Sequence, residues 1–324
     1  MKPKKIGLLT SWGDAPGMNA AIRSVVRSAV NSGLKVTGIM RGFEGLLSGD
    51  IIEMHADTVS DILNKGGTIL RTARCPEIMN ADGQDKAAGL CRILNLDCLV
   101  VIGGDGSFRG ALELTRRGVN VIGIPGTIDL DMGCTEYAIG FDTAINTAVY
   151  AIDKISDTST SHERCSVVEV MGRHAGYIAL WSGLTCGAEV VLIPEKSGEQ
   201  NNVDSIIAQI IENRALGKTH NLIVVAEGVG GSDALAKEIE RMTGIETRAT
   251  ILGHLQRGGS PTAVDRMHAA YMGNKAIECV LNNERNRVIV YRNGVHESMD
   301  IEEAVRYERP YDDTMYNIIR ILAR

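Results

Sequence analysis

The sequence is short of aromatic residues, of proline and of paired cysteines, and these shortages narrow the classes of protein that it can encode. Its 324 residues include two Trp, eight Tyr, three Phe and seven Pro. The seven cysteines are an odd number and form no C-x-x-C pair, which predicts reduced thiols in a cytoplasmic protein rather than a disulfide framework. No two of the seven histidines stand at i, i+4, so a histidine-based zinc site is not expected.

Basic charge and long apolar runs are also missing. The formal net charge is −6 and no basic stripe occurs, so nucleic acid is not expected as a partner. No apolar run reaches roughly 18 residues, the least that spans a membrane as a helix. The first residues superficially resemble a signal peptide, but the apolar stretch is short and reaches Asp14 before any cleavage site. A soluble protein of about two domains, with no membrane partner, is therefore expected.

Three common nucleotide and hydrolase motifs are absent as well. The sequence contains no G-x-x-x-x-G-K-[ST], no G-x-G-x-x-G after an apolar run and no G-x-S-x-G. These absences argue against Walker-type NTPases, Rossmann dehydrogenases and lipase-like hydrolases.

Glycine, in contrast, is abundant: it occupies 36 of the 324 positions, against roughly 7% in average proteins. The glycines show no three-residue period and form no Ser-Gly tracts, which excludes collagen and flexible linkers. They follow short apolar runs instead, as glycines do where a backbone turns tightly or approaches a ligand.

Apolar runs and amphipathic stretches alternate along nearly the whole chain. This pattern predicts an α/β fold with parallel sheets and helices on both faces. Strands are expected at 6–10, 34–40, 98–102, 119–124, 166–170, 189–193 and 221–225, and helices at 19–32, 141–158, 203–217, 234–244, 262–283 and 301–324. The pattern begins again near residue 140, which indicates two similar halves.

Two glycine-rich segments follow expected strands and precede expected helices: GDAPGMN at 13–19 and GGDGS at 103–107. In open sheets ligands bind in the loops at the carboxyl ends of the strands. Glycines let the backbone approach phosphate closely, and the helix start offers N–H groups. A carboxylate such as Asp105 suits Mg²⁺. The alternative is a structural turn in each case, with Asp105 and Asn19 acting as helix N-caps.

The segment PGTIDLD at 125–131 holds two carboxylates, Asp129 and Asp131. If the segment is extended, both side chains point to one side. One could then act as general base on a hydroxyl while the other organises a metal or an arginine. The alternative is a pair of surface carboxylates in a loop. Five arginines beside glycines or strand ends suggest phosphate binding: Arg74, Arg164, Arg173, Arg248 and Arg257.

Assembled, these segments resemble the bacterial type of ATP-dependent 6-phosphofructokinase over nearly the full length. The resemblance rests on GDAPGMNAAIR, GGDGS, PGTIDLD, SHERCSVVEVMGRHAG and ETRATILGHLQRGGSP. It implies a kinase that uses ATP and Mg²⁺ to phosphorylate the 1-hydroxyl of fructose 6-phosphate, the committed step of glycolysis. It also implies an α/β fold of two Rossmann-like three-layer domains with mostly parallel sheets, and an active site in the cleft between them.

The resemblance further implies what each domain does. The larger domain, residues 1–140 plus about 256–304, would bind ATP and Mg²⁺. The smaller domain, residues 141–255 plus about 305–324, would bind the sugar phosphate. In this family the chains form homotetramers in which Arg164 and Arg248 reach across from a neighbouring subunit.

Residue roles follow from the same motifs. Asp129 is implied as the base, Thr127, Arg74 and Arg173 as further catalytic groups, and Asp105 as the metal-side carboxylate. The implied ATP contacts are Gly13, Arg74, Cys75, Gly104, Asp105, Gly106 and Ser107. The implied fructose 6-phosphate contacts are Thr127, Ile128, Asp129, Arg164, Met171, Gly172, Arg173, Glu227, Arg248, His254, Leu255, Gln256 and Arg257.

Two glycines bear on the phosphoryl donor. Pyrophosphate-using relatives carry Asp at the place of Gly106 and Lys at the place of Gly126, so this sequence favours ATP. A pyrophosphate-dependent kinase remains an alternative. So does a catalytically poor sensor of sugar phosphate or nucleotide, because the sequence departs from the family near the donor.

Those departures are Trp12, where the family has glycine, and Leu130, where it has asparagine. A tryptophan would be strained if position 12 needs positive φ. If its ring faces the nucleotide, it would restrict ATP or stack on it.

An effector site for ADP or phosphoenolpyruvate is implied at Arg23, Arg27, Glu189 and Lys218. Basic residues of regulated family members are replaced here by Ala56, Ser156 and Leu216. Allosteric control is therefore expected to be weak or altered. Initial-rate assays with each effector measure it, and full activation by ADP with strong inhibition by phosphoenolpyruvate would contradict the expectation.

Overall fold

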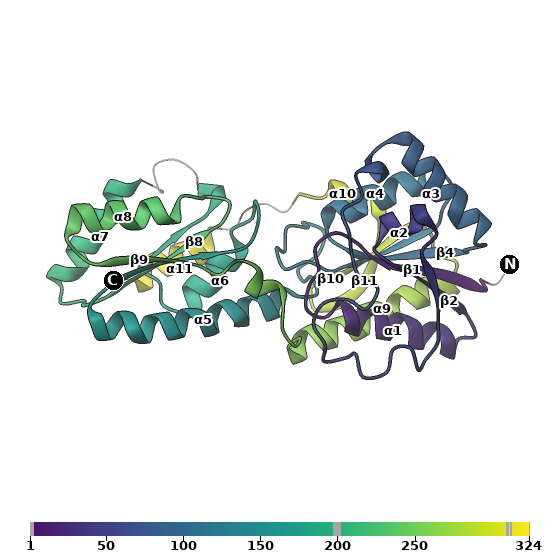
Figure 1. Ribbon diagram of the computed structural model, residues 1–324, viewed down its shortest axis with the longest axis horizontal. Coiled ribbons are helices and arrows are strands. Elements are labelled where there is room, and N and C mark those ends of the chain that lie inside the picture. Colours follow the sequence, from purple (N-terminus) through teal and green to yellow (C-terminus); the bar gives the residue numbers. More distant parts are fainter. Residues whose placement is uncertain (1–2, 197–201, 309–310, 312, 324) are drawn as a thin grey trace. The chain divides into compact units, whose positions relative to one another are not determined.

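The computed structural model describes residues 3–196, 202–308, 311 and 313–323. The chain forms two compact units, each made of two segments (Figure 1). Unit 1 comprises Met1–Thr143 and Arg257–Arg309, and unit 2 comprises Ala144–Gln256 and Pro310–Arg324. Both units have the predicted α/β architecture with mostly parallel sheets.

Unit 1 is built on a seven-stranded sheet of order β11-β10-β5-β4-β1-β2-β3. Neighbouring strands are parallel except at the two edges, where β3 and β11 run antiparallel to their partners. Every residue of β4 and β5 is buried, as expected for central parallel strands covered on both faces. The strands are β1 (Lys5–Thr10), β2 (Lys35–Ile39), β3 (Ile51–Met54), β4 (Cys98–Gly103), β5 (Val121–Pro125), β10 (Arg287–Arg292) and β11 (Val295–Asp300).

Helices cover both faces of this sheet. On one face α1 (Met18–Asn31) packs against α9 (Ala263–Leu281) (Figure 1). The sequence places apolar residues of α1 at helical spacing, so that one side of the helix is buried. The opposite face carries α2 (Phe43–Ser48), the short helix η1 (Pro76–Met79), α3 (Ala81–Ile93), α4 (Asp105–Thr115) and α10 (Ile301–Arg306).

Unit 2 has a four-stranded parallel sheet of order β7-β8-β6-β9. Its strands are β6 (Cys165–Val170), β7 (Val190–Leu192), β8 (Asn221–Ala226) and β9 (Thr247–Ile251). In Figure 1, α7 (Val203–Ala215) and α8 (Ser232–Thr243) cover one face, with α5 (Phe141–His162) and α6 (Tyr177–Thr185) on the other. The helix α11 (Thr314–Leu322) packs on α6 and β7. The described residues also form two short helices, η2 (Pro194–Lys196) and η4 (Gly253–Arg257).

The predicted single helix over 301–324 is wrong, because α10 ends at Arg306 and α11 begins only at Thr314. The sequence has Pro310 between them, and proline cannot continue a helix interior.

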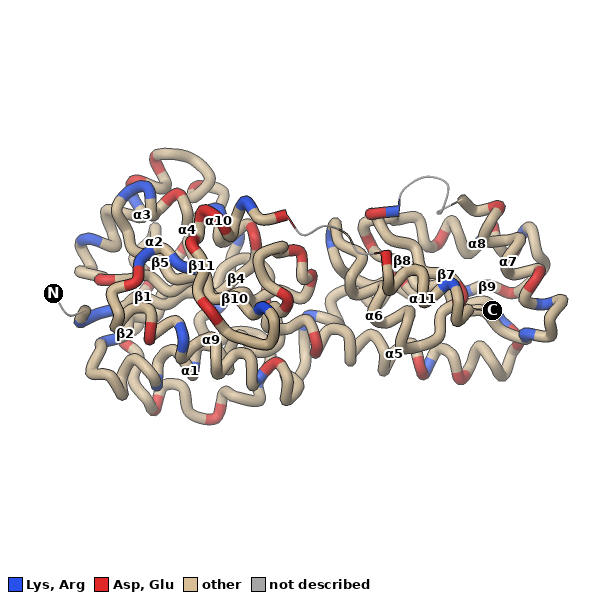
Figure 2. The backbone as a smooth tube through the Cα atoms, turned by 180° about the vertical axis from the view of Figure 1, so that it is seen from behind, with Lys and Arg blue, Asp and Glu red and all other residues tan. Residues whose placement is uncertain are grey.

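Charged residues of both signs are interspersed along both units (Figure 2). Within the described residues, no helix combines the length and the apolar character that crossing a membrane requires.

A buried carboxylate, Asp265, joins the start of α5 to the start of α9. It is fully buried and accepts hydrogen bonds from the Tyr137 hydroxyl (2.6 Å) and from the backbone N–H groups of Gly140 (2.6 Å) and Thr143 (2.9 Å). The Thr143 hydroxyl donates to it as well. The carboxylate therefore stabilises the first turn of α5 with both its charge and its hydrogen bonds.

Beside this carboxylate, the buried ring of His268 stacks on Tyr137 with centroids 3.8 Å apart. Its Nδ1 lies 2.9 Å from Nε2 of His296. Burial, together with the nearby His296, lowers the pKa of His268 to about 4. The folded protein thus disfavours the charged imidazole.

This lowered pKa predicts a loss of stability in mild acid. Below the ordinary histidine pKa of about 6.5 the unfolded chain binds a proton that folded His268 takes up only near pH 4. We expect the free energy of unfolding to decrease by about 2 kcal/mol between pH 7 and pH 5 through this group. Urea unfolding at both pH values measures it. His268→Gln should have a shallower pH dependence, and equal slopes for the two proteins would contradict the prediction.

Candidate functional site

Three neighbouring strands of unit 1, β5, β4 and β1, are parallel and therefore end at one edge of the sheet. Each is followed by one of the glycine-containing segments singled out in the sequence: 125–131, 103–107 and 13–19. The fold thus places these three loops next to one another.

In the loop after β1, the backbone is fixed on both sides. The N–H of Ser11 donates to the Ile102 carbonyl (3.0 Å). The helix α1 begins at Met18 after Gly17, which has φ of 107° and no side chain that could cap the helix. A Cβ at Gly17 would lie 2.6 Å from Ile139, so this position requires glycine both for its φ and for space.

The alternative role of Asn19 as an N-cap is wrong, because Asn19 lies inside α1. Its side-chain amide donates to the carbonyls of Lys65 and Gly66 (3.1 Å each), and its Oδ1 accepts from the N–H of Ile69 (2.8 Å). Asn19 therefore holds the segment 65–69 against α1.

In the loop after β4, Gly104 is the N-cap of α4, and Asp105 is the first residue of the helix. The predicted alternative of Asp105 as N-cap is therefore also wrong. Its carboxylate pairs with Arg109 (2.7 Å). The Ser107 hydroxyl donates to the Ser11 carbonyl (3.2 Å) and joins this loop to the one after β1. A Cβ at Gly106 would meet no atom within 4 Å, so the backbone there faces open space.

In the loop after β5, Asp129 and Thr127 are both buried. The N–H of Asp129 donates to the Thr127 hydroxyl (3.1 Å), and the N–H of Gly126 donates to the Gly103 carbonyl (2.9 Å). A Cβ at Gly104 would lie 3.5 Å from that of Thr127. The buried carboxylate and hydroxyl therefore follow a turn that is bonded directly to the GGDGS loop. Ile128 between them is fully buried.

The segment between the two aspartates is not extended, so the condition under which both side chains would point to one side is not met. Leu130 has φ of 51°, which is a left-handed conformation. The backbone changes direction there, and Asp131 is exposed whereas Asp129 is buried. The two carboxylates therefore have different surroundings, and only Asp129 has the sheltered position of a candidate base.

Trp12 also has a left-handed backbone, with φ of 74°, and the residue is 43% exposed. The guanidinium carbon of Arg74 lies 5.6 Å from the centre of the Trp12 ring, within the range of a cation–π contact. Cys75, the next residue, is buried, and burial raises the pKa of its thiol. Cys75 is thus a neutral packing residue at neutral pH rather than a nucleophile.

Arg257 lies beside the loop after β1. Its Nη1 donates to the Asp14 carbonyl (3.2 Å), and a Cβ at Gly13 would lie 2.7 Å from that nitrogen. The absence of a side chain at Gly13 therefore makes room for Arg257, which the sequence had assigned to the sugar phosphate.

Unit 2 gathers a second set at the carboxyl ends of its strands. The N–H of Arg173, after β6, donates to Oε1 of Glu227, after β8 (2.7 Å). The N–H of Met171 donates to Oε1 of the buried Gln256 (3.3 Å). Gly172 has φ of 141°, and a Cβ there would lie 2.3 Å from the Ala175 carbonyl. The structure thus brings together five of the predicted sugar-phosphate residues, with His254 and Leu255 exposed on the adjoining η4.

Arg164 and Arg248 do not belong to this set. Both pair with Glu246, at 2.8 Å and 2.7 Å, and the hydrogen bonds from Arg164 and Arg248 lower the pKa of that carboxyl. They lie at the amino ends of β6 and β9. The six residues of β6 separate this end from Arg173 by about 20 Å, so the two arginines lie at the opposite edge of the same sheet.

The predicted effector residues form two pairs in different units. Arg23 and Arg27 lie on α1 in unit 1. In unit 2, Nζ of Lys218 lies 3.5 Å from Oε1 of Glu189 and donates to the Ala323 carbonyl (2.5 Å). Oε2 of Glu189 accepts from the N–H of Leu222 (2.6 Å). Glu189 and Lys218 are thus already bonded within their own unit.

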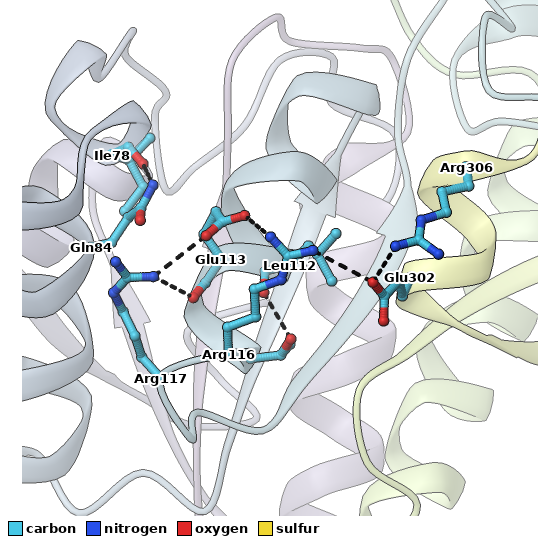
Figure 3. Close-up of polar contacts among 9 residues, drawn as sticks. Ile78, Gln84, Leu112, Glu113, Arg116, Arg117, Glu302 and Arg306 are labelled. Carbon is cyan, nitrogen blue, oxygen red and sulfur yellow. Dashed lines mark hydrogen bonds and ion pairs between the residues drawn. The ribbon is translucent and has the colours of Figure 1, made fainter.

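The sequence did not predict a hollow of roughly 650 Å³ bordered by η1, α3, α4 and α10. Figure 3 shows its charged rim: Arg116 lies between Glu113 (2.5 Å) and Glu302 (3.5 Å), and Arg306 pairs with Glu302 (2.6 Å). Arg117 reaches Glu113 as well (3.4 Å). In the sequence, Glu113 stands three and four positions before Arg116 and Arg117, and this helical spacing could have predicted their ion pairs. Because these arginines are paired, the rim joins α4 to α10 rather than forming a vacant anion site.

Within the described residues no three His, Cys, Asp or Glu side chains form a group that could hold a metal ion. Mg²⁺ does not need such a group, since it takes one or two protein carboxylates together with phosphate oxygens and water. Asp105, with its side chain 37% exposed in the first turn of α4, fits that requirement.

These features define a class of protein. It is a two-unit α/β protein in which glycine-rich loops of the kind that bind phosphate, and a buried carboxylate, follow the carboxyl ends of neighbouring parallel strands. The family model for phosphofructokinase matches residues 5–280. The ATP-dependent 6-phosphofructokinase of Clostridium botulinum (strain Hall) is 55% identical over 99% of this chain and 100% of its own length. The enzyme of that name from Clostridium acetobutylicum is 53% identical over the same shares. The chain belongs to the phosphofructokinase family, as its motifs predicted.

The fold agrees with this assignment. A phosphofructokinase structure from Saccharomyces cerevisiae is similar with a TM-score of 0.87 and 34% identity. The match covers 99% of this chain and 48% of the yeast chain, so the present chain spans about half of that longer protein.

Proposed function

We propose that the protein transfers the γ-phosphoryl group of ATP to the 1-hydroxyl of fructose 6-phosphate, giving fructose 1,6-bisphosphate in the cytoplasm. The observation that carries this proposal is the buried pair Thr127 and Asp129, in a loop bonded directly to the loop that opens α4. A phosphoryl transfer needs a base beside a phosphate site, and this arrangement supplies both.

Unit 1 would bind the triphosphate. The helices α1 and α4 both begin after a glycine that has no capping side chain. Their first turns therefore present backbone N–H groups and the positive ends of two helix dipoles. The backbone at Gly106 faces open space, and Gly13, Gly104, Ser107 and Cys75 would be further contacts of the nucleotide. Bound Mg²⁺ supplies charge neutralisation at the phosphate oxygens, and Asp105 would hold it.

Asp129 would take the proton of the sugar hydroxyl, and Thr127 and Arg74 would stabilise the transferring group. Unit 2 would hold the sugar phosphate through Met171, Gly172, Arg173, Glu227 and η4. Catalysis would then depend on positioning and on charge stabilisation, which is what phosphoryl transfer requires.

The glycines at 106 and 126 support ATP as the donor. Space is open at Gly106, where an added carboxylate would repel a phosphate. At Gly126, a Cβ would lie 3.1 Å from Ile102 and 3.3 Å from Met18, so a lysine there would require both neighbours to move. Both named relatives are ATP-dependent enzymes.

The placement of Arg164 and Arg248 supports a shared site. Because they lie about 20 Å from Arg173 along β6, they cannot join the sugar-phosphate set of their own chain. We propose that they serve a neighbouring subunit in a homotetramer. Light scattering measures the assembly, and a monomer under assay conditions would contradict this part.

A coupled assay with fructose 6-phosphate and either ATP or pyrophosphate tests the function. We expect turnover with ATP and Mg²⁺ and none with pyrophosphate. Turnover with pyrophosphate would reverse the donor assignment. Sugar-phosphate binding without turnover with either donor would favour a sensor.

A further inference from the structure

Trp12 combines two properties that need an explanation. Its backbone is in the left-handed region, which a bulky side chain rarely adopts. Yet the residue is 43% exposed, so burial in a core does not account for the strain. Strained backbone positions persist where the surrounding structure holds them, and they gather at functional sites.

Hydrogen bonds on both sides hold this conformation. Before Trp12, the Ser11 carbonyl accepts from the Ser107 hydroxyl (3.2 Å). The carbonyl of Trp12 itself accepts from the Thr72 hydroxyl (2.7 Å). These bonds to the loop after β4 and to the segment that leads to Arg74 hold the backbone that carries the ring.

Hydrogen bonds also fix the backbone of the segment that leads to Arg74. The Thr10 hydroxyl, at the end of β1, lies 2.9 Å from the Arg71 carbonyl and 2.9 Å from the Thr68 hydroxyl. Together with the bond from Thr72 to Trp12, these contacts attach the segment 68–72 to the end of β1. The side chain of Arg74 is long and exposed, and its guanidinium carbon lies 5.6 Å from the centre of the Trp12 ring.

We propose that Trp12 is a positioning residue, whose ring holds the Arg74 guanidinium ready to meet the phosphoryl group of ATP. The proposal rests on the proposed function, which gives Arg74 a role in the transfer. An arginine held before the substrate arrives loses less side-chain freedom in the transition state. Trp12 would thus act on the donor through Arg74, without itself touching the reacting atoms.

A double-mutant cycle tests the proposal. Trp12→Asn removes the ring but keeps a residue that tolerates left-handed backbone, and Trp12→Phe keeps a ring. We expect Trp12→Asn to lower kcat about two- to fivefold, the range that an exposed cation–π contact supports, with a smaller change in KM for ATP. Trp12→Phe should retain at least half of kcat. In an Arg74→Met background, Trp12→Asn should have no further effect.

If Trp12 had only a structural role, its replacement would destabilise the protein. We expect instead that urea unfolding shows Trp12→Asn to be as stable as the wild-type protein or more so, since the strain is relieved. An unchanged kcat, or an equal loss with and without Arg74, would overturn the proposal. Absence of turnover in the wild-type protein would instead overturn the proposed function itself, so the two failures are distinct.

The contact has a readout that needs no catalysis. The sequence has two tryptophans, Trp12 and Trp181, so Trp181→Phe leaves Trp12 as the sole indole emitter. We expect Arg74→Met in this background to change the intensity or the wavelength of Trp12 emission. Identical spectra with and without Arg74 would show that the ring and the guanidinium do not meet in solution, and would overturn the proposal.

Discussion

Asp129→Asn is expected to lower kcat by about 10²- to 10⁴-fold, the usual contribution of a positioned general base. The amide has nearly the shape of the carboxylate, so the hydrogen bond from the Asp129 N–H to Thr127 is kept, but it cannot accept the hydroxyl proton. Because binding of the sugar phosphate does not depend on proton transfer, its KM should change much less. Steady-state rates at saturating ATP and fructose 6-phosphate measure both quantities.

Asp131→Asn is the matched control. This carboxylate lies two residues further along the same loop but is exposed. Its removal should leave kcat within about tenfold of the wild-type value, since it lacks the sheltered position that makes a base effective. An equal loss of kcat in Asp129→Asn and Asp131→Asn would contradict the assignment of Asp129 as the base.

Asp265→Ala is expected to destabilise unit 1 by about 3–5 kcal/mol. The substitution leaves the Tyr137 hydroxyl and two backbone N–H groups without their buried acceptor, and each unsatisfied donor costs about 1–3 kcal/mol. Urea unfolding followed by circular dichroism measures the loss.

Asp82→Ala provides the comparison for that loss. Asp82 occupies the first turn of α3, as Asp265 occupies the first turn of α9, but it is exposed. Its removal should cost at most about 1 kcal/mol, the usual contribution of a charge at a helix start. Equal losses in the two variants would show that the buried hydrogen bonds of Asp265 add nothing.

Two of the strands that the sequence predicts most clearly are β4 and β8, which lie inside their sheets. Both strands are wholly buried and, apart from Asn221 at the start of β8, contain no polar side chain, so a continuous apolar run identifies them. The antiparallel edge strands β3 and β11 were not predicted, because they are partly exposed and contain polar residues. Their pairing depends on neighbours distant in the sequence, which no local pattern shows.

The loops were identified by their glycines, but their local geometry was not. The alternative N-cap roles of Asn19 and Asp105 are wrong, because Gly17 and Gly104 precede the helices and take the cap position. Asp129 and Asp131 do not share one extended segment, because Leu130 between them has a left-handed backbone that a leucine gives no reason to expect. Nothing local indicated that Asp265 would bond Gly140 across 125 positions, or that Arg164 and Arg248 would share Glu246.

The most direct test of the account follows the phosphoryl group itself. ³¹P NMR of a mixture of protein, ATP, Mg²⁺ and fructose 6-phosphate should show the γ-phosphate signal of ATP decreasing as a second sugar phosphate appears on the 1-carbon, and Asp129→Asn should slow this by the factor given above. Loss of the γ-phosphate to inorganic phosphate, or an unchanged spectrum although the protein binds fructose 6-phosphate, would contradict the proposed kinase.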